Sequence, residues 1–156
     1  KENFVSLIKK LITNKNSDHC RFILIGSKNE KYIGDFICKS FNKDRIINLI
    51  GKPKLIEVCS ILKKCKLFIG NDSGLMHLAA SLKIPTVGLF GPSDIKQYSP
   101  WGDNTLSIKT PESPSELMKN EFFSPKNKAS LMKSLKVIKV EKEIINFHNK
   151  LNVKKK

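Results

Sequence analysis

The sequence has 156 residues, of which 40% are hydrophobic, so it can form one hydrophobic core of single-domain size. Its net charge is +15, but Arg21 and Arg45 are the only arginines, and no basic stretch alternates with aromatic residues at a base-stacking spacing. We therefore expect no nucleic acid partner and interpret most lysines as solvated surface. No apolar stretch approaches the roughly 20 residues of a membrane span.

Helices and strands are predicted to alternate along the first half of the chain. Apolar residues at helical spacing predict a helix over residues 4–12, and a strand over 21–25 follows a polar turn. A helix over 29–41, a strand over 45–50 and a helix over 55–64 come next, the last with Leu55, Val58, Cys59 and Leu62 facing inward. This alternation predicts an α/β fold in which a parallel sheet is connected by right-handed crossovers.

The second half continues the pattern. A short buried strand over residues 67–69 leads into a helix after Ser73, and a strand over 84–90 has Pro85 near its start, where a missing N–H is tolerated. A last strand is expected over 105–108. Residues 110–128 are rich in Pro, Ser and Lys and are interpreted as a loop, before a closing helix over 140–151 and a Lys-rich tail over 152–156.

The junction after the strand at 67–69 has the residues of an anion site. Ser73 is a good N-cap residue, Gly74 allows a ligand to approach the backbone, and His77 follows Ser73 by one helical turn. Unpaired N–H groups and the helix dipole favour a phosphate at such a helix start. A purely structural alternative stays open, in which Asp72 and Ser73 only cap the helix.

A second polar turn, formed by Gly91, Pro92, Ser93 and Asp94, follows the strand at 84–90. Ligands of open α/β sheets bind outside the carboxyl ends of the strands, so both turns are expected at one edge of the sheet. We interpret Pro92, Ser93 and Asp94 mainly as support for that edge.

Residues 71–94, NDSGLMHLAASLKIPTVGLFGPSD, resemble the donor-binding signature of the glycosyltransferase family 9 heptosyltransferases. That signature begins with Asp, followed by Ser or Thr and then by Gly. It continues with His-Leu-Ala-Ala and a proline. It ends with Gly-Pro, followed by Ser or Thr and then by Asp. Weaker family features match residues 2–11, Gly26 to Glu30, and 134–147. Leu131 stands where many relatives have a cysteine in a Cys-Met-x-x-Ile stretch, matched here by Leu131, Met132 and Leu135, which leaves the subfamily open.

The resemblance implies a Rossmann-like parallel sheet with helices on both faces, the C-terminal half of a GT-B glycosyltransferase. Residues 1–151 would be the nucleotide-sugar domain, and the acceptor-binding and catalytic N-terminal domain is expected outside this chain. The implied reaction is inverting and metal-independent, and transfers a heptose from ADP-heptose to a lipopolysaccharide core acceptor. No cofactor and no catalytic residue are expected within the chain, which by itself should bind donor weakly without turning it over.

Individual site residues also follow from the resemblance. Asp72 would contact the donor, Ser73, Gly74 and His77 would hold its diphosphate, and Leu75 would belong to the donor site. Glu30 would bind the ribose hydroxyls, although a first-turn glutamate also suits the helix dipole without any ligand. Leu55, Ile56 and Met76 could flank the adenine or belong to the core.

Two other function classes stay open at this stage: another GT-B-like enzyme, such as a UDP-sugar epimerase or hydrolase, and a non-catalytic nucleotide-binding module. The four cysteines, Cys20, Cys38, Cys59 and Cys65, form no Cys-x-x-Cys pair and are expected to be buried free thiols in a reducing compartment. We expect a cytoplasmic location. Since the implied acceptors lie on an anionic leaflet, a basic surface would favour peripheral contact with the inner membrane.

Overall fold

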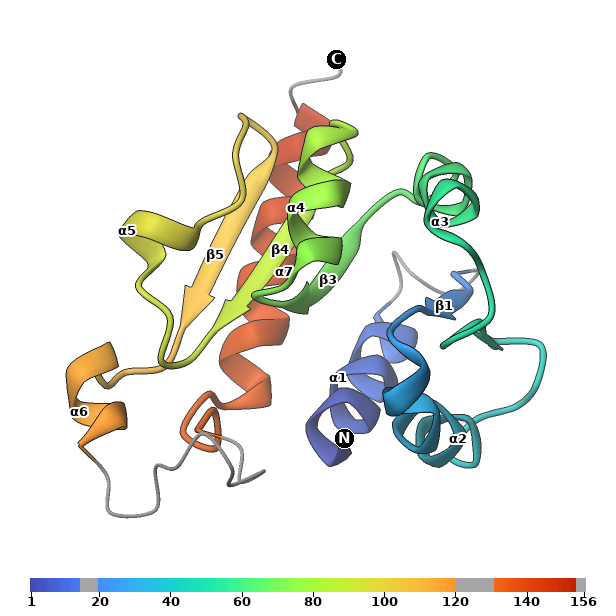
Figure 1. Cartoon of the computed structure of the whole chain (residues 1–156), viewed down its shortest axis with the longest axis horizontal. Coiled ribbons are helices and arrows are strands. Elements are labelled where there is room, and N and C mark those ends of the chain that lie inside the picture. Colours follow the sequence, from blue (N-terminus) through green and yellow to red (C-terminus); the bar gives the residue numbers. More distant parts are fainter. Residues whose placement is uncertain (15–19, 120–130, 154–156) are drawn as a thin grey trace. The chain divides into compact units, whose positions relative to one another are not determined.

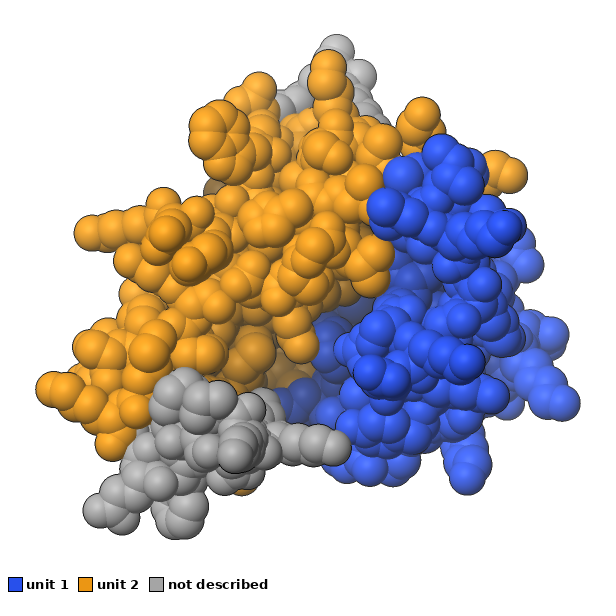
Figure 2. All heavy atoms as spheres, in the orientation of Figure 1, with its two compact units in different colours: residues 1–61 blue, residues 62–156 orange. Residues whose placement is uncertain are grey.

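The computed structural model describes residues 1–14, 20–119 and 131–153, which form two compact units, Lys1–Ile61 (unit 1) and Leu62–Lys156 (unit 2) (Figure 2). Each unit contains its own parallel sheet flanked by helices. Among the helices of the described ranges, none has the length and the hydropathy needed to cross a bilayer.

Unit 1 is a helical layer on a two-stranded parallel sheet. Its strands pair in parallel with Phe22 opposite Ile46, and its core gathers Ile8, Ile37 and Ile46 from two helices and a strand. In chain order the elements are α1 (Glu2–Thr13), β1 (Phe22–Leu24), the 3-10 helix η2 (Lys28–Glu30), α2 (Lys31–Cys38), β2 (Ile46–Asn48) and α3 (Leu55–Leu62). All five predicted elements of this half are confirmed, with shorter strands than the sequence indicated.

Unit 2 is built around a three-stranded parallel sheet of order β3-β4-β5 (Figure 1). The central strand β4 (Thr86–Phe90) is buried along its whole length because it has a neighbour on each side. The other elements are β3 (Phe68–Asn71), α4 (Gly74–Ser81), α5 (Ile95–Tyr98), β5 (Thr105–Lys109), α6 (Pro114–Met118) and α7 (Val137–Val153).

Helix α4 packs closely on the sheet because Gly88 of β4 leaves room for the side chain of Met76. A Cβ on Gly88 would lie 2.5 Å from Sδ of Met76 and 2.7 Å from a ring carbon of Phe90, so a larger residue would force these side chains to move. Met76 and Ala79 are completely buried there. Figure 1 shows α4 and α7 on opposite faces of this sheet, which confirms the predicted parallel sheet with helices on both faces.

Two expectations about the second half are wrong in their bounds, and one helix forms where none was expected. Residues 114–118, within the predicted loop, form α6, because Ser113 and Glu116 make a capping box around Pro114 at the first position. Helix α5 follows the second polar turn and was not predicted. Helix α7 begins at Val137 and continues through Val153, so the first two residues of the expected tail are helical, while 120–128 and 154–156 lie outside the described residues.

Burial corrects two further expectations. Leu55 is 68% exposed although the helical pattern placed it inward, whereas Val58 and Leu62 of α3 are buried as expected. Leu55 is the first residue of α3, and the first three residues of this helix are all exposed. As predicted, no disulfide joins the four cysteines, which all lie in the described ranges, but each is only partly buried.

Candidate functional site

The two polar turns meet at the carboxyl edge of the sheet in unit 2, the edge at which β3, β4 and β5 end. Asn71 pairs with Leu89, and the backbone N–H of Asp72 donates to the carbonyl of Leu89 at 3.1 Å. The turn after β3 is thereby tied to the last residues of β4, directly before Gly91. The predicted proximity of the two turns is confirmed, because parallel pairing puts both strand ends at one edge.

Asp72 and His77 form a pair above the first turn of α4. The Nε2 atom of His77 lies 3.8 Å from Oδ1 of Asp72, and the two side chains are 45% and 23% exposed, respectively. The backbone N–H of His77 donates to the carbonyl of Ser73 at 3.3 Å, which sets the one-turn spacing read from the sequence. The pair therefore presents a carboxylate and an imidazole to solvent on the side where the helix begins.

Ser73 occupies the N-cap position in an extended conformation, but its side chain makes no capping hydrogen bond to the helix. Its carbonyl accepts from the N–H groups of Met76 and His77. The N–H groups of Gly74 and Leu75 precede the first intrahelical bond and point out of the helix start. The hydroxyl of Ser73 makes no hydrogen bond to these N–H groups, so they are donors suited to an anionic ligand.

Gly74 has no structural need to be glycine. A Cβ built on it would meet nothing within 4 Å, and its φ lies outside the left-handed region. Neither the packing nor the backbone conformation of the chain explains the missing side chain. A ligand that approaches the backbone at this point would explain it.

The second polar turn has structural partners of its own. The carboxylate of Asp94 caps α5 by accepting from the N–H of Lys96 at 2.9 Å, while Pro92 and Ser93 are partly exposed beside it. A Cβ on Gly91 would lie 2.7 Å from Cγ of Met132. Residues 131–135 therefore pack directly against this turn.

That packing identifies a part of the edge that the sequence did not predict. The hydroxyl of Ser134 donates to Oε2 of Glu112 at 2.6 Å, and Leu135 is buried. Together with Met132 on Gly91, this bond holds residues 131–135 at the ends of β4 and β5. No local pattern could have shown it, because Ser134 and Glu112 are 22 positions apart.

Glu30 lies in unit 1, where its local role is clear. Oε2 of Glu30 accepts from the backbone N–H of Ser27 at 2.8 Å and from the hydroxyl of Ser27 at 2.7 Å, which completes a capping box. The Ser-x-x-Glu spacing of residues 27–30 already carries that signal. The capping role explains Glu30 without a ligand, and its role toward a ribose stays a prediction.

The three residues considered for the adenine differ in burial. Met76 is completely buried under α4 and belongs to the core, whereas Leu55 and Ile56 are 68% and 72% exposed. Leu75, predicted to belong to the donor site, is partly buried in the first turn of α4.

Neither a metal site nor the hollow along α7 involves the residues at the start of α4. Within the described ranges, no group of three or more His, Cys, Asp or Glu is placed to hold a metal ion. A hollow of about 460 Å³ runs along α7, and it is lined by Ile138, Lys139, Glu141, Lys142, Glu143, Ile145 and Asn146. Because that lining alternates lysine with glutamate, its opposite charges offset each other and do not favour an anion.

Sequence comparison shows that the chain, including this edge, matches a known family. Residues 1–125 match the model of glycosyltransferase family 9 (heptosyltransferase). The chain is 32% identical over 105 residues to lipooligosaccharide heptosyltransferase 2 of Campylobacter jejuni, a match that covers 66% of this chain and 33% of the relative. It is 34% identical over 94 residues to lipopolysaccharide heptosyltransferase 2 of Escherichia coli K12, covering 58% and 26%. The chain thus matches about a third or less of the length of these relatives.

Solved structures show the same fold. ADP-heptose lipopolysaccharide heptosyltransferase II of E. coli superposes with a TM-score of 0.74 at 24% identity, over 96% of this chain and 41% of that one. E. coli heptosyltransferase WaaC with ADP superposes with a TM-score of 0.73 at 22% identity, over 94% and 38%. Both likenesses extend over nearly the whole chain but under half of the solved one, which identifies this fold as part of a larger GT-B architecture. The family match includes the strand ends, the first turn of α4 and the second polar turn. The chain therefore belongs to glycosyltransferase family 9.

Proposed function

We propose that this chain is the donor-binding half of a heptosyltransferase that transfers a heptose from ADP-heptose to a lipopolysaccharide core acceptor. The observation that carries the proposal is the open start of α4. There Gly74 leaves the backbone accessible, Ser73 leaves the first N–H groups uncapped, and His77 is exposed one turn later. The family membership supports the same reading.

In the proposed reaction the nucleotide diphosphate leaves with growing negative charge. The N–H groups of Gly74 and Leu75 and the imidazole of His77 would stabilise that charge at the helix start. One preorganised donor of this kind contributes on the order of 3 kcal/mol to lowering a barrier. Asp72 would orient His77, from which it is 3.8 Å away, and contact the donor directly.

The proton of the acceptor hydroxyl would be removed by a base outside these 156 residues, with inversion at the anomeric carbon. We propose that leaving-group stabilisation uses the helix dipole and His77 in place of a divalent ion. The isolated chain is then expected to bind nucleotide without transferring sugar. Glu30 would add hydrogen bonds to the ribose if its carboxylate accepts from a ligand as well as from Ser27.

The choice of ADP as the nucleotide is supported by the structural neighbours. WaaC of E. coli was solved with ADP and also with ADP-2-deoxy-2-fluoro heptose, the second at a TM-score of 0.69. We extend that donor to this chain because the fold that holds it covers 93% or more of the residues here. A cytoplasmic location and peripheral contact with an anionic membrane belong to the same proposal, and the net charge of +15 supports the contact.

Calorimetric titration of the chain with ADP, UDP and GDP tests the proposal. We expect heat of binding with ADP and much weaker binding of the other two. A preference for UDP would instead favour another GT-B-like nucleotide-sugar enzyme. An absence of binding at millimolar concentrations of all three would favour a module that does not bind nucleotides through this edge.

A further inference from the structure

The amino edge of the sheet in unit 2, where β3, β4 and β5 begin, forms a continuous surface. The N–H of Phe68 donates to the carbonyl of Pro85 at 2.8 Å, and the N–H of Thr86 donates to the carbonyl of Asn104 at 3.0 Å. These bonds hold the segments that lead into the three strands side by side. We call this surface the amino edge and define it as residues 63–67, 81–85 and 100–104. It lies at the other end of the strands from the candidate donor residues.

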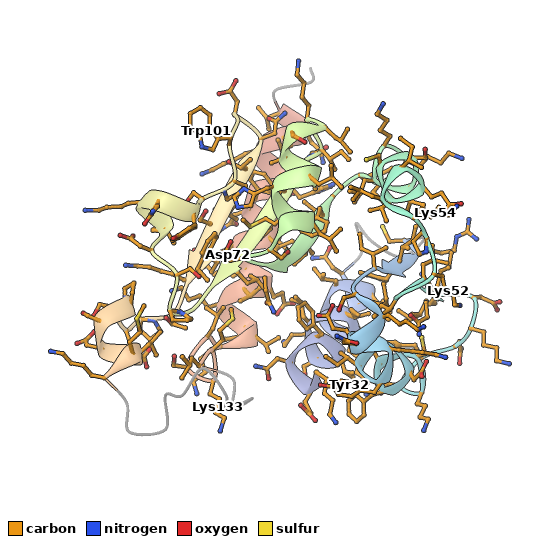
Figure 3. All side chains as sticks on the ribbon, viewed as in Figure 1. Tyr32, Lys52, Lys54, Asp72, Trp101 and Lys133 are labelled. Carbon is orange, nitrogen blue, oxygen red and sulfur yellow. The ribbon has the colours of Figure 1, made fainter. Side chains whose placement is uncertain are left out.

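Trp101 projects from the amino edge into solvent. Its side chain is 87% exposed, and it is the only tryptophan of the sequence (Figure 3). The backbone beside it is well held, because Pro100 is buried and the hydroxyl of Thr105 donates to the carbonyl of Gly102 at 2.9 Å. Gly102 has a φ of 114°, a conformation that favours glycine, so the turn that presents the indole is specific. The fold thus holds a large apolar ring in solvent, where burial in the core does not stabilise it.

The charges of the amino edge are one-sided. Four lysines of the amino edge are exposed, namely Lys63, Lys64, Lys66 and Lys83, and Asp103 is the one acidic residue among its positions. The carboxyl edge is mixed by contrast, since Asp72, Asp94 and Glu112 alternate there with lysines. The amino edge therefore complements an anionic surface, and the carboxyl edge does not.

We propose that the amino edge docks on an anionic lipid bilayer, with the indole of Trp101 at the level of the headgroups and the lysines on their phosphates. Tryptophan has an apolar body and a polar N–H, which suits the boundary between headgroups and acyl chains. Lysine is a point charge on a flexible stem and suits headgroups that have no fixed arrangement. Each lysine near such a surface strengthens binding roughly fivefold at moderate salt.

A nucleic acid and a protein partner fit this surface less well. Binding of a single strand uses several aromatic rings on which successive bases stack, whereas the amino edge offers one indole. A specific protein interface uses a cluster of large anchors that fill pockets, and the other exposed residues of the amino edge are lysines and small polar side chains. This proposal assigns a surface to the membrane contact of the proposed function. It does not involve the donor site, so a failure of vesicle binding would leave the proposal for ADP binding intact.

Because Trp101 is the only tryptophan, its fluorescence reports on the amino edge directly. The full chain is titrated with vesicles of phosphatidylglycerol and phosphatidylcholine, and with vesicles of phosphatidylcholine alone. We expect the emission to shift to shorter wavelength with the anionic vesicles only, and lipids brominated near the headgroup to quench it. Raising the salt to about 0.5 M, where the Debye length is roughly 4 Å, should reverse the shift.

A pair of matched double variants tests the lysines. Lys64→Gln with Lys66→Gln removes two charges from the amino edge and should weaken vesicle binding at least tenfold, given roughly fivefold for each lysine. Lys133→Gln with Lys136→Gln removes two exposed charges near the carboxyl edge and should change binding less than twofold. In Figure 3, Lys133 and Trp101 lie at opposite ends of unit 2. Far-UV circular dichroism verifies that all variants are folded.

Several results would overturn the proposal. These are no binding to anionic vesicles at low salt, binding without a change in Trp101 emission, and equal losses in the two double variants. A larger emission shift with a single-stranded oligonucleotide than with vesicles of equal negative charge would assign the surface to nucleic acid instead.

Discussion

Gly91 and Met132 are in a contact that a side chain at position 91 would disturb. A Cβ at position 91 would lie 2.7 Å from Cγ of Met132 and 3.8 Å from the carbonyl oxygen of Leu131. Through this contact a segment near the end of the chain rests on the turn that follows β4. The family signature residue Gly91 therefore has a structural function, while Gly74, in the same signature, has none that the chain itself explains.

The contact predicts the effect of Gly91→Ala. The new methyl group would displace Met132 or the turn, so we expect the free energy of unfolding to fall by about 1–3 kcal/mol, as in other overpacked sites. Chemical denaturation of the two proteins measures it. Removing the clash with Met132→Ala in the same chain should recover part of the loss, and an unchanged denaturation midpoint in the single variant would contradict the packing described here.

Gly74→Ala is the matched counterpart. Because a Cβ meets nothing within 4 Å, the free energy of unfolding should stay the same or rise by up to about 1 kcal/mol. If a diphosphate approaches this backbone, the methyl group should nevertheless weaken ADP binding about tenfold or more. Titration calorimetry and denaturation separate the two effects. Unchanged ADP affinity would remove Gly74 from the donor site.

His77→Gln tests the imidazole at the start of α4. A hydrogen bond from a charged or strongly polar donor to phosphate is worth about 1.5–3 kcal/mol, so the dissociation constant for ADP should rise about tenfold or more. Asp72→Asn should produce a loss in the same direction, since Asp72 lies 3.8 Å from His77. Asp94→Asn serves as control, because Asp94 caps α5 and an asparagine can also accept there. An equal loss in the control would point to a general change of the edge.

The capping box of α6 predicts a pH dependence. Hydrogen bonds from the hydroxyl of Ser113, and then from its backbone N–H, hold the pKa of Glu116 below its ordinary value of 4.5. A carboxyl whose pKa is lowered in the folded chain stabilises the fold above the unfolded pKa, and this contribution is lost as the pH falls below 4.5. In an NMR titration the midpoint of Glu116 should lie below that value and rise toward it in Ser113→Ala. A midpoint at the ordinary value in the unchanged chain would contradict the capping box.

The periodic elements were predictable because their residues interact locally. The helical spacing of apolar residues in α1, and the β-branched and aromatic residues of β4, identify the element types without any knowledge of partners. The polar turn at Asp72 to Gly74 was equally visible, since capping and glycine chemistry depend on neighbours in the sequence. Helix α6 was missed although its Ser-x-x-Glu signature was present, because the surrounding Pro, Ser and Lys favoured a loop.

The sequence alone determined the α/β alternation, the strand-to-helix turn with an anion-binding start, and the family resemblance, because each depends on residues close together in the chain. Only the tertiary structure decided which of these residues have structural partners. It buried Met76, left Leu55 in solvent, gave Glu30 and Asp94 local hydrogen bonds, and placed Met132 on Gly91. The physical reason is that burial and long-range contacts depend on how the elements pack, and parallel strands bring together segments far apart in the sequence.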